Sequence, residues 1–285
     1  MMTRAMVEDA AGRAGADLFG VASIGRFDEL PAEKRPGAIF PEARSVIVLG
    51  RRIPRGALRG VEEGTNFTNY LLYGLDWLDN RFTSLTTIRV AEFLEDNGWE
   101  AVPLPNLPPE VPPLGVKVRK DAPAPNVMLD FDDAAVRAGV GEIAWCDCLV
   151  TPQFGTRQRI QVILTDATLE EDPLCEGTLS PSAEECRDLC PLGAFVGEDV
   201  RTVCGRSFPV ARIDYARCRK CKNGAVPNRV HPAGKPDRVA AVCLRGLLDL
   251  MERQGKVSNR FAVPLRIRSA WTVPLDADLY NLGEK

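Results

Sequence analysis

The sequence of 285 residues contains a single histidine, His231, and no run of about 18 apolar residues. One histidine excludes an HExxH zinc site, a Cys-His-His zinc centre and a facial triad with two histidines, because each needs at least two imidazoles. Without a long apolar run there is no ordinary membrane span, and the first residues lack the apolar core of a secretory signal. We therefore expect a cytoplasmic protein with no membrane partner.

An excess of one charge is also missing. The net charge is −3, and the basic residues are spread along the chain, which argues against nucleic acid as the main partner. A composition of 45% hydrophobic and 26% charged residues is that of an ordinary globular protein. At this length we expect one large domain or two unequal ones.

Hydrophobic patterning predicts an α+β arrangement in the first part of the chain. The patterns indicate helices at 5–16, at 66–98 (one helix or two in succession) and at 132–141, and strands at 18–24, 44–50, 99–105 and 159–166. Residues 103–126 contain eight prolines and predict a loop that crosses a surface or covers a site. After Pro173 the pattern changes to short apolar pieces with many cysteines. We expect an α+β domain at 1–170 and a cysteine-rich module at 171–285.

Two short motifs lie close together in the first domain. The run Gly139-x-Gly141-x-x-Ala144 matches a minimal dinucleotide fingerprint, but a helical pattern precedes it and an extended one follows, the reverse of what that fingerprint needs. It therefore predicts a tight turn from helix to strand. Cys146 and Cys148 follow on a predicted strand, where they would point to the same face, either into the core or toward a cofactor.

Nine cysteines, an odd number, are unlikely to be paired as disulfides in a reducing cytoplasm. Seven of them fall between residues 175 and 243, which favours metal binding over structural thiols. Cys186 and Cys190, followed by Pro191, match the end of the iron–sulfur spacing C-x2-C-x2-C-x3-C-P. The first two cysteines of that spacing are replaced by Ser180 and Ala183.

A second pair of cysteines, Cys218 and Cys221, has C-x2-C spacing, and Cys243 lies 22 residues beyond it. Zinc is the alternative for such a pair, but a second C-x2-C at the usual interval is missing. Seven cysteines suffice for one [4Fe-4S] cluster and are one short of two. We expect one or two clusters, with candidate ligands Cys175, Cys186, Cys190, Cys218, Cys221 and Cys243.

Three carboxylates, Asp130, Asp132 and Asp133, stand at the start of the helix predicted near 132. Aspartate at such a position caps free N–H groups and complements the helix dipole. A carboxyl group of raised pKa in a poorly solvated site could instead act as a general acid. We expect capping for two of the three and a catalytic role for the third, with Asp130 and Asp133 as the candidates.

Several phrases in succession resemble the epoxyqueuosine reductases and the related reductive dehalogenases, above all their short homologues in anaerobes. They are "ADLFGVASIGRF", "PEARSVIVLG", "AAVRAGVGEIAW", "CLVTPQFGTRQRIQVILTDATLEEDPLCEG", "CRDLCPLGAF" and the ending "AAVCLRGLLDLMERQGKVSNRFAVPLRIRSAW". The resemblance implies a nitroreductase-like α+β domain that binds base-off cobalamin, followed by a ferredoxin-like module with [4Fe-4S] clusters. Base-off binding needs no histidine below cobalt, which agrees with the near absence of histidine.

The resemblance also implies which residues line the corrinoid. The matching segment supplies small or apolar side chains suited to a flat macrocycle, namely Gly141, Leu149, Thr151, Pro152 and Phe154. Cys146 and Cys148, which replace the residues usual in those homologues, are further candidate cofactor contacts from their predicted strand alone. In such enzymes the clusters reduce cobalt to Co(I), and an acid delivers a proton as a carbon–oxygen or carbon–halogen bond is cleaved.

We therefore expect a reductase that depends on cobalamin and [4Fe-4S] clusters, takes electrons from an external ferredoxin or flavodoxin-type donor, and acts on a small organic substrate. One alternative is a corrinoid-binding or electron-transfer protein that reduces a partner's cobalt and has no substrate of its own. Another is a structural iron–sulfur or zinc protein whose first domain has lost its cofactor.

Overall fold

A four-stranded antiparallel sheet lies at the centre of the protein in the computed structural model, which describes residues 2–112 and 115–270. The strand order is β1-β2-β6-β3. The strands are β1 (Leu18–Ser23), β2 (Ser45–Arg52), β3 (Ala101–Leu104) and β6 (Gln158–Thr165). The four strands predicted for this part of the chain are confirmed, and the overall class is mixed α and β.

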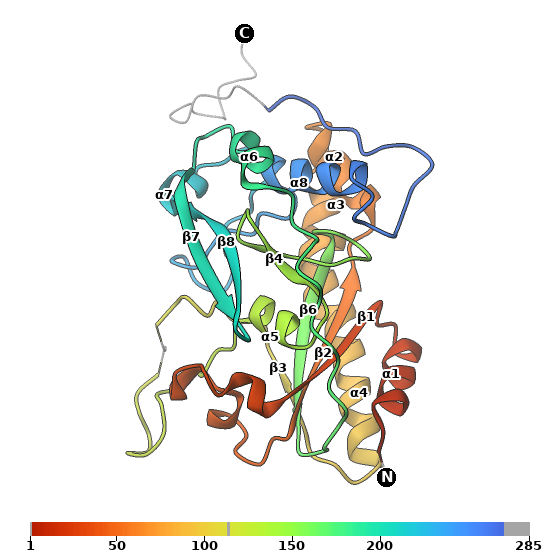
Figure 1. Ribbon diagram of the computed structural model, residues 1–285, viewed down its shortest axis with the longest axis vertical. Helices are drawn as coiled ribbons and strands as arrows, with labels where there is room; N and C mark the ends of the chain where they lie inside the picture. The colour runs from red at the N-terminus through yellow and green to blue at the C-terminus, as the bar shows by residue number, and fades with distance from the viewer. Residues whose placement is uncertain (1, 113–114, 271–285) are drawn as a thin grey trace.

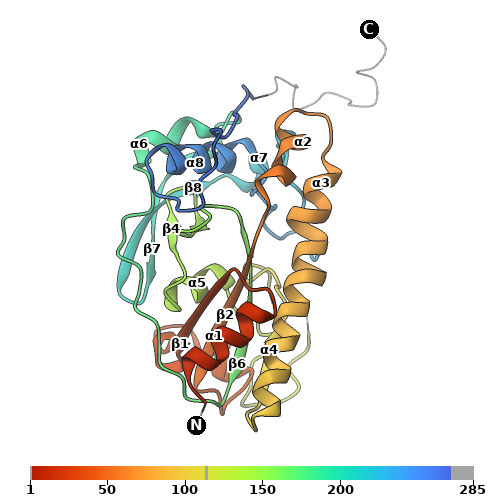
Figure 2. The same ribbon diagram turned by 90° about the vertical axis from the view of Figure 1, so that its right-hand side faces the viewer.

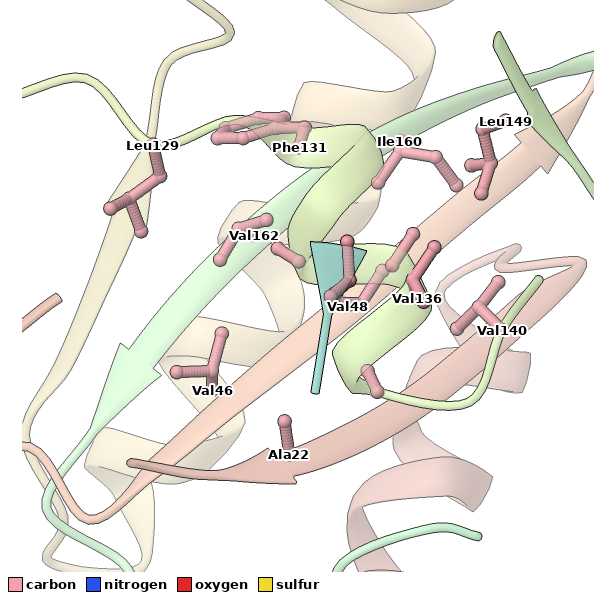
Figure 3. Packing of buried hydrophobic residues seen from close by; sticks show 14 of the residues in the cluster. Ala22, Val46, Val48, Leu129, Phe131, Val136, Val140, Leu149, Ile160 and Val162 are labelled. Atoms are coloured by element: carbon pink, nitrogen blue, oxygen red, sulfur yellow. The ribbon is translucent and has the colours of Figure 1, made fainter. Parts of the chain in front are cut away.

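Both faces of the sheet are covered. On β2, Val46 and Val48 point to one face, while Ile47 and Leu49 point to the other, and all four side chains are buried. The second face packs against α1 (Arg4–Arg13) and α4 (Ser84–Asp96), and the first against the short helix α5 (Phe131–Arg137). Figure 2 shows α5 and the α4 segment on opposite sides of the sheet, and Figure 3 shows Phe131 and Val136 of α5 clustered with Val48, Ile160 and Val162.

The segment predicted as one or two helices at 66–98 is a long helical rod along one side of the molecule (Figure 2). It begins with α3 (Thr68–Tyr70), passes through the π-helical turns η5 (Leu71–Asp76) and η6 (Leu78–Thr83), and ends as α4. π-Helical turns are rare and occur frequently at functional sites. Here they carry Leu75, Asp76 and Asp79 to the wall of a cavity described below.

The turn from helix to strand predicted at Gly139 is confirmed. α5 ends at Arg137, Gly139 has a φ of 68°, and strand β4 (Glu142–Ala144) follows. The predicted strand through Cys146 and Cys148 is wrong, because the chain turns between β4 and β5 (Cys148–Val150), with Asp147 at a φ of 51°. The two cysteines therefore do not share a face: Cys146 is fully buried in the turn, and Cys148 lines the cavity.

The cysteine-rich part of the chain forms a hairpin and short helices at one end of the molecule (Figure 1). Its elements are α6 (Ala183–Cys186), η7 (Arg187–Leu189), β7 (Phe195–Val203), β8 (Arg206–Ile213), α7 (Tyr215–Cys218) and α8 (Val242–Arg253). The buried Glu142 carboxylate accepts the backbone N–H groups of Gly177, Thr178 and Leu179, which ties this part to β4. Trp145 and Cys146 share one apolar core with Cys186, Cys243 and Leu247.

The remaining helical elements are short. They are the 3-10 turns η1 (Ile24–Phe27), η2 (Ala32–Lys34), η3 (Pro36–Ala38) and η4 (Arg55–Leu58), and helix α2 (Arg59–Glu62). None of the helices in residues 2–112 and 115–270 has the length and apolar character that crossing a membrane requires.

Replacing Gly141 by alanine is expected to lower the free energy of unfolding by at least about 2 kcal/mol. A Cβ at this position would lie 2.2 Å from the carbonyl oxygen of Val150, inside the β4–β5 hairpin, where the backbone cannot easily move. Gly12→Ala is the matched control: it lies in α1 with nothing within 4 Å of the added Cβ. That variant is expected to gain about 0.5–1 kcal/mol, because glycine is unfavourable in a helix. Urea denaturation of both variants measures whether each substitution lowers or raises the free energy of unfolding.

Candidate active-site cavity and four-cysteine group

A cavity of about 350 Å³ opens between the central sheet and the cysteine-rich part of the chain. Its walls come from the π-helical turns, the loop at 106–110, the start of α5, strands β5 and β6, and the loop at 227–239. The loop at 106–110 belongs to the proline-rich stretch, which was predicted to cross a surface or cover a site, and it forms part of the cavity wall. Exposed side chains form the rim, including Asn80, Glu110, Arg229 and Lys235.

The three aspartates at the start of α5 have three different environments. Asp130 is the N-cap: its side chain accepts the N–H of Asp133, and it forms an ion pair of 2.5 Å with Arg201. Asp133 points away from the cavity and forms an ion pair of 2.7 Å with the fully buried Arg137. Asp132 lies in the cavity wall and accepts the backbone N–H of Leu149 at 3.3 Å. Of the two catalytic candidates, Asp130 lines the cavity and Asp133 does not.

Asp132 has the properties that a general acid needs. Burial and then the negative charge of Asp130 raise its pKa to about 6, against the opposing charge of Arg201. A carboxyl group with this pKa is partly protonated near neutral pH and can give a proton to a bound molecule. Sequence analysis named Asp132 together with its neighbours. Its position in the predicted helix could not show that loops distant in the sequence form a cavity beside it.

Four cysteines of the second part form a group that we call the four-cysteine group: Cys190, Cys218, Cys221 and Cys243. Burial is the largest cause that raises the pKa of the Cys218 thiol, and the charges of Cys221 and Cys190 raise it further. The pKa of Cys243 is raised to about 12, first by burial and then by the charges of the other three. Such mutual effects place the four sulfurs within range of one another's charges.

Backbone N–H groups point at two sulfurs of the four-cysteine group. The N–H of Ala194 donates to Cys190 Sγ at 3.4 Å, and the N–H groups of Asn223 and Ala225 lower the pKa of Cys221 against the effect of burial. Hydrogen bonds to sulfur stabilise thiolates and tune the potential of iron–sulfur clusters.

The two other cysteines named as ligands lie elsewhere. The Cys175 thiol donates to the carbonyl oxygen of Gly139 at 3.2 Å. Cys186 is hydrogen-bonded to Cys146, and both are fully buried. Among the described residues no three His, Cys, Asp or Glu side chains are grouped closely enough to hold a single metal ion. Ligands of a four-iron cube are farther apart than those of one ion, because the cube lies between them.

Arg238 connects the cavity with the four-cysteine group. Its side chain lines the cavity, and it is 8% exposed. Burial lowers its pKa, but Cys243, Tyr215, Cys148 and Cys218 raise it by more, so the guanidinium stays charged beside these sulfurs. Sequence analysis missed this residue, because nothing in the loop "GKPDRVAAVC" marks one arginine as a contact of distant thiols.

The residues predicted to contact the corrinoid are not gathered around the cavity. Cys148 and Leu149 line it. Cys146, Thr151 and Phe154 are buried elsewhere, Gly141 is pressed against Val150, and Pro152 lies at a different surface pocket. These seven residues therefore do not form one slot.

Comparison with known proteins supports the fold. No protein-family model matches the chain, and no curated protein matches it by sequence. A reductive dehalogenase, whose structure is described as suggesting a mechanism for B12-dependent dehalogenation, matches with a TM-score of 0.53 at 17% identity over 89% of this chain and 34% of its own. A catabolic reductive dehalogenase in complex with 3-bromo-4-hydroxybenzoic acid matches with a TM-score of 0.51 at 16% identity over 88% of this chain and 33% of its own.

Epoxyqueuosine reductases match with lower scores. The enzyme from Bacillus subtilis has a TM-score of 0.49 at 16% identity over 83% of this chain and 70% of its own. One solved with an epoxyqueuosine-modified tRNA stem loop has a TM-score of 0.46 at 17% identity, over 72% of this chain and 54% of its own. The chain thus spans about half of the latter and about a third of the dehalogenases. Over most of its length the chain has a mixed α and β structure similar to that of the reductive dehalogenases.

Proposed function

We propose that the protein is an iron–sulfur oxidoreductase that takes electrons from an external ferredoxin or flavodoxin-type donor and reduces a small organic substrate in the cavity. The observation that supports this most is the position of Arg238, which lines the cavity and carries a charge that acts on Cys243, Cys218 and Cys148. An electron held at the four-cysteine group would therefore be separated from the cavity by little more than one layer of side chains.

The residues present fit a [4Fe-4S] cluster. Four thiols match its ligand number, and a cluster bound there would supply electrons one at a time. Backbone N–H groups donate to the sulfurs of Cys190 and Cys221. The guanidinium groups of Arg238 and Arg245 interact with Cys243 and would offset the negative charge of the thiolates.

The residues present do not fit the corrinoid that the resemblance implies. Five of the seven candidate contacts lie outside the cavity lining, and a volume of about 350 Å³ is at the small end of sites for drug-sized ligands. Base-off cobalamin is much larger than such a ligand. We derive no step of the reaction through it.

The reaction that we propose is reductive cleavage of a carbon–oxygen or carbon–halogen bond. Two electrons from the donor and one proton convert R–X into R–H and X⁻. Asp132 gives the proton to the carbon and regains one from solvent through the cavity mouth. The Leu149 N–H fixes the orientation of the Asp132 carboxylate, and Arg201 keeps its pKa from rising further.

Turnover by the reconstituted protein tests this function. The full chain, loaded anaerobically with iron and sulfide, is mixed with reduced ferredoxin and a panel of brominated and epoxide-bearing small molecules. We expect more than one product per chain from at least one compound, no product from Cys218→Ser, and no increase on adding cobalamin. Oxidation of ferredoxin only when a separate corrinoid protein is added would contradict the proposal and favour an electron-transfer role.

A further inference from the structure

Three buried polar atoms without a hydrogen-bond partner line the same cavity. They are Asp79 Oδ1, Thr156 Oγ1 and Arg238 Nη1, and they make up half of the six such atoms found among the described residues. Folded proteins pair nearly all buried polar groups, because an unpaired one costs about 1–3 kcal/mol. Thr156 is 2% exposed and Arg238 8%, so neither reaches bulk solvent easily. Their gathering in one cavity indicates that a ligand supplies the missing partners.

The charges of the cavity wall decide which ligand suits it. Seven acidic and five basic side chains line the cavity, which leaves an excess of two carboxyl groups. Four of the basic side chains are ion-paired with carboxylates of the same wall, and the fifth, Arg238, donates to the backbone carbonyl of Asp147 at 2.6 Å. Within residues 2–112 and 115–270, the side chains of Asp79, Asp132 and Glu110 have no ion pair.

The two unpaired carboxyls that lie deeper in the cavity come from different walls. Asp79 is carried by η6 and Asp132 by the start of α5. An anionic ligand would add negative charge to a wall that already has an excess of carboxyl groups, whereas a cationic ligand would offset that excess. The free N–H of Arg238 needs an acceptor, such as a carbonyl or carboxylate oxygen.

We propose that the cavity binds a small organic molecule that carries a protonated amine, held by Asp79, and a carbonyl or carboxylate oxygen, held by Arg238. The amine donates to the Asp79 carboxylate, Thr156 Oγ1 bonds a further polar group of the ligand, and Asp132 keeps the role of acid proposed above. The volume of about 350 Å³ limits the ligand to the small end of drug-sized molecules. This inference names the substrate class of the oxidoreductase proposed above and depends on that proposal for the chemistry, but not for the binding.

Calorimetry with three matched probes tests the binding on the full chain, reconstituted anaerobically. The probes are 3-(aminomethyl)benzamide, 3-(hydroxymethyl)benzamide and 3-carboxybenzamide, which differ in one group that is cationic, neutral or anionic. We expect the amine to bind at least tenfold more tightly than the neutral probe and the acid to bind most weakly. Tighter binding of the acid, equal binding of all three, or no binding at millimolar concentration would overturn the inference.

Variants locate the contact. Asp79→Asn should weaken binding of the amine at least tenfold and change binding of the neutral probe by less than twofold. Asp9→Asn, which makes the same change at the surface of α1, should alter neither. Thermal unfolding confirms that each variant is folded, and an unchanged affinity of Asp79→Asn for the amine would refute the assignment. Binding without turnover would refute the proposed function alone, whereas turnover of a purely anionic substrate would refute this inference alone.

Discussion

Cys218→Ser is expected to remove the iron from the reconstituted protein, lowering it from about four atoms per chain to fewer than one. Cys218 lies in the four-cysteine group, where the sulfurs of Cys221 and Cys190 act on it and Arg238 lies close to it. A hydroxyl group is a poor substitute for a thiolate toward iron, so the loss of one ligand leaves three. Iron and sulfide analysis after anaerobic reconstitution measures the loss.

Cys175→Ser is the control for this change. Its thiol lies outside the four-cysteine group and donates to Gly139. The variant should retain the full iron content, and the small loss in stability should reflect one altered hydrogen bond. If Cys175→Ser loses the iron while Cys218→Ser retains it, the ligand set is a different one.

Asp132→Asn is expected to have the second large effect, a loss of turnover by about 10²–10⁴-fold, because the amide cannot give a proton.

The Asp132→Asn variant should also be more stable than the parent above pH 6. Burial raises the pKa of Asp132 from 3.8 to about 6, so the folded state holds a proton that the unfolded state has already released. The stability that Asp132 contributes is therefore full below pH 4 and lost as the pH rises through 6. We expect Asp132→Asn to gain about 2 kcal/mol at pH 8 and little at pH 4.

Asp133→Asn separates this effect from a general change at the start of α5. Its partner Arg137 is fully buried, so the variant leaves a buried guanidinium with a weakened set of partners and should lose about 3 kcal/mol. Urea denaturation of the two variants at pH 4 and pH 8 measures whether each substitution raises or lowers the free energy of unfolding. Equal stability changes for the two variants at pH 8 would show that the environment of Asp132 is not the cause.

The central sheet could be predicted from the sequence, because its two inner strands, β2 and β6, are rich in β-branched residues and are buried on both faces. β2, with Val46, Ile47 and Val48, is an example. The turn at Gly139 could also be predicted, because the helical pattern before it and the extended pattern after it leave no room for a dinucleotide site. The density of cysteines between 175 and 243 indicated the four-cysteine group.

The cavity could not be predicted in the same way. Asp79 and Arg238 line the same cavity, although they lie about 160 residues apart in the sequence. No local sequence pattern indicates that these two segments come together. The turn at Asp147 was missed because its neighbours have the apolar character of a strand, while the left-handed φ of Asp147 depends on how the hairpin closes. This turn separates Cys146 from Cys148.

Electron paramagnetic resonance of the anaerobically reconstituted protein, reduced with dithionite, tests the central claim most directly. The account predicts the signal of one reduced [4Fe-4S] cluster per chain, whose line shape changes when a molecule binds in the cavity, because Arg238 lies between the two. A protein that takes up zinc in place of iron, or a cluster signal that no cavity ligand perturbs, would contradict it.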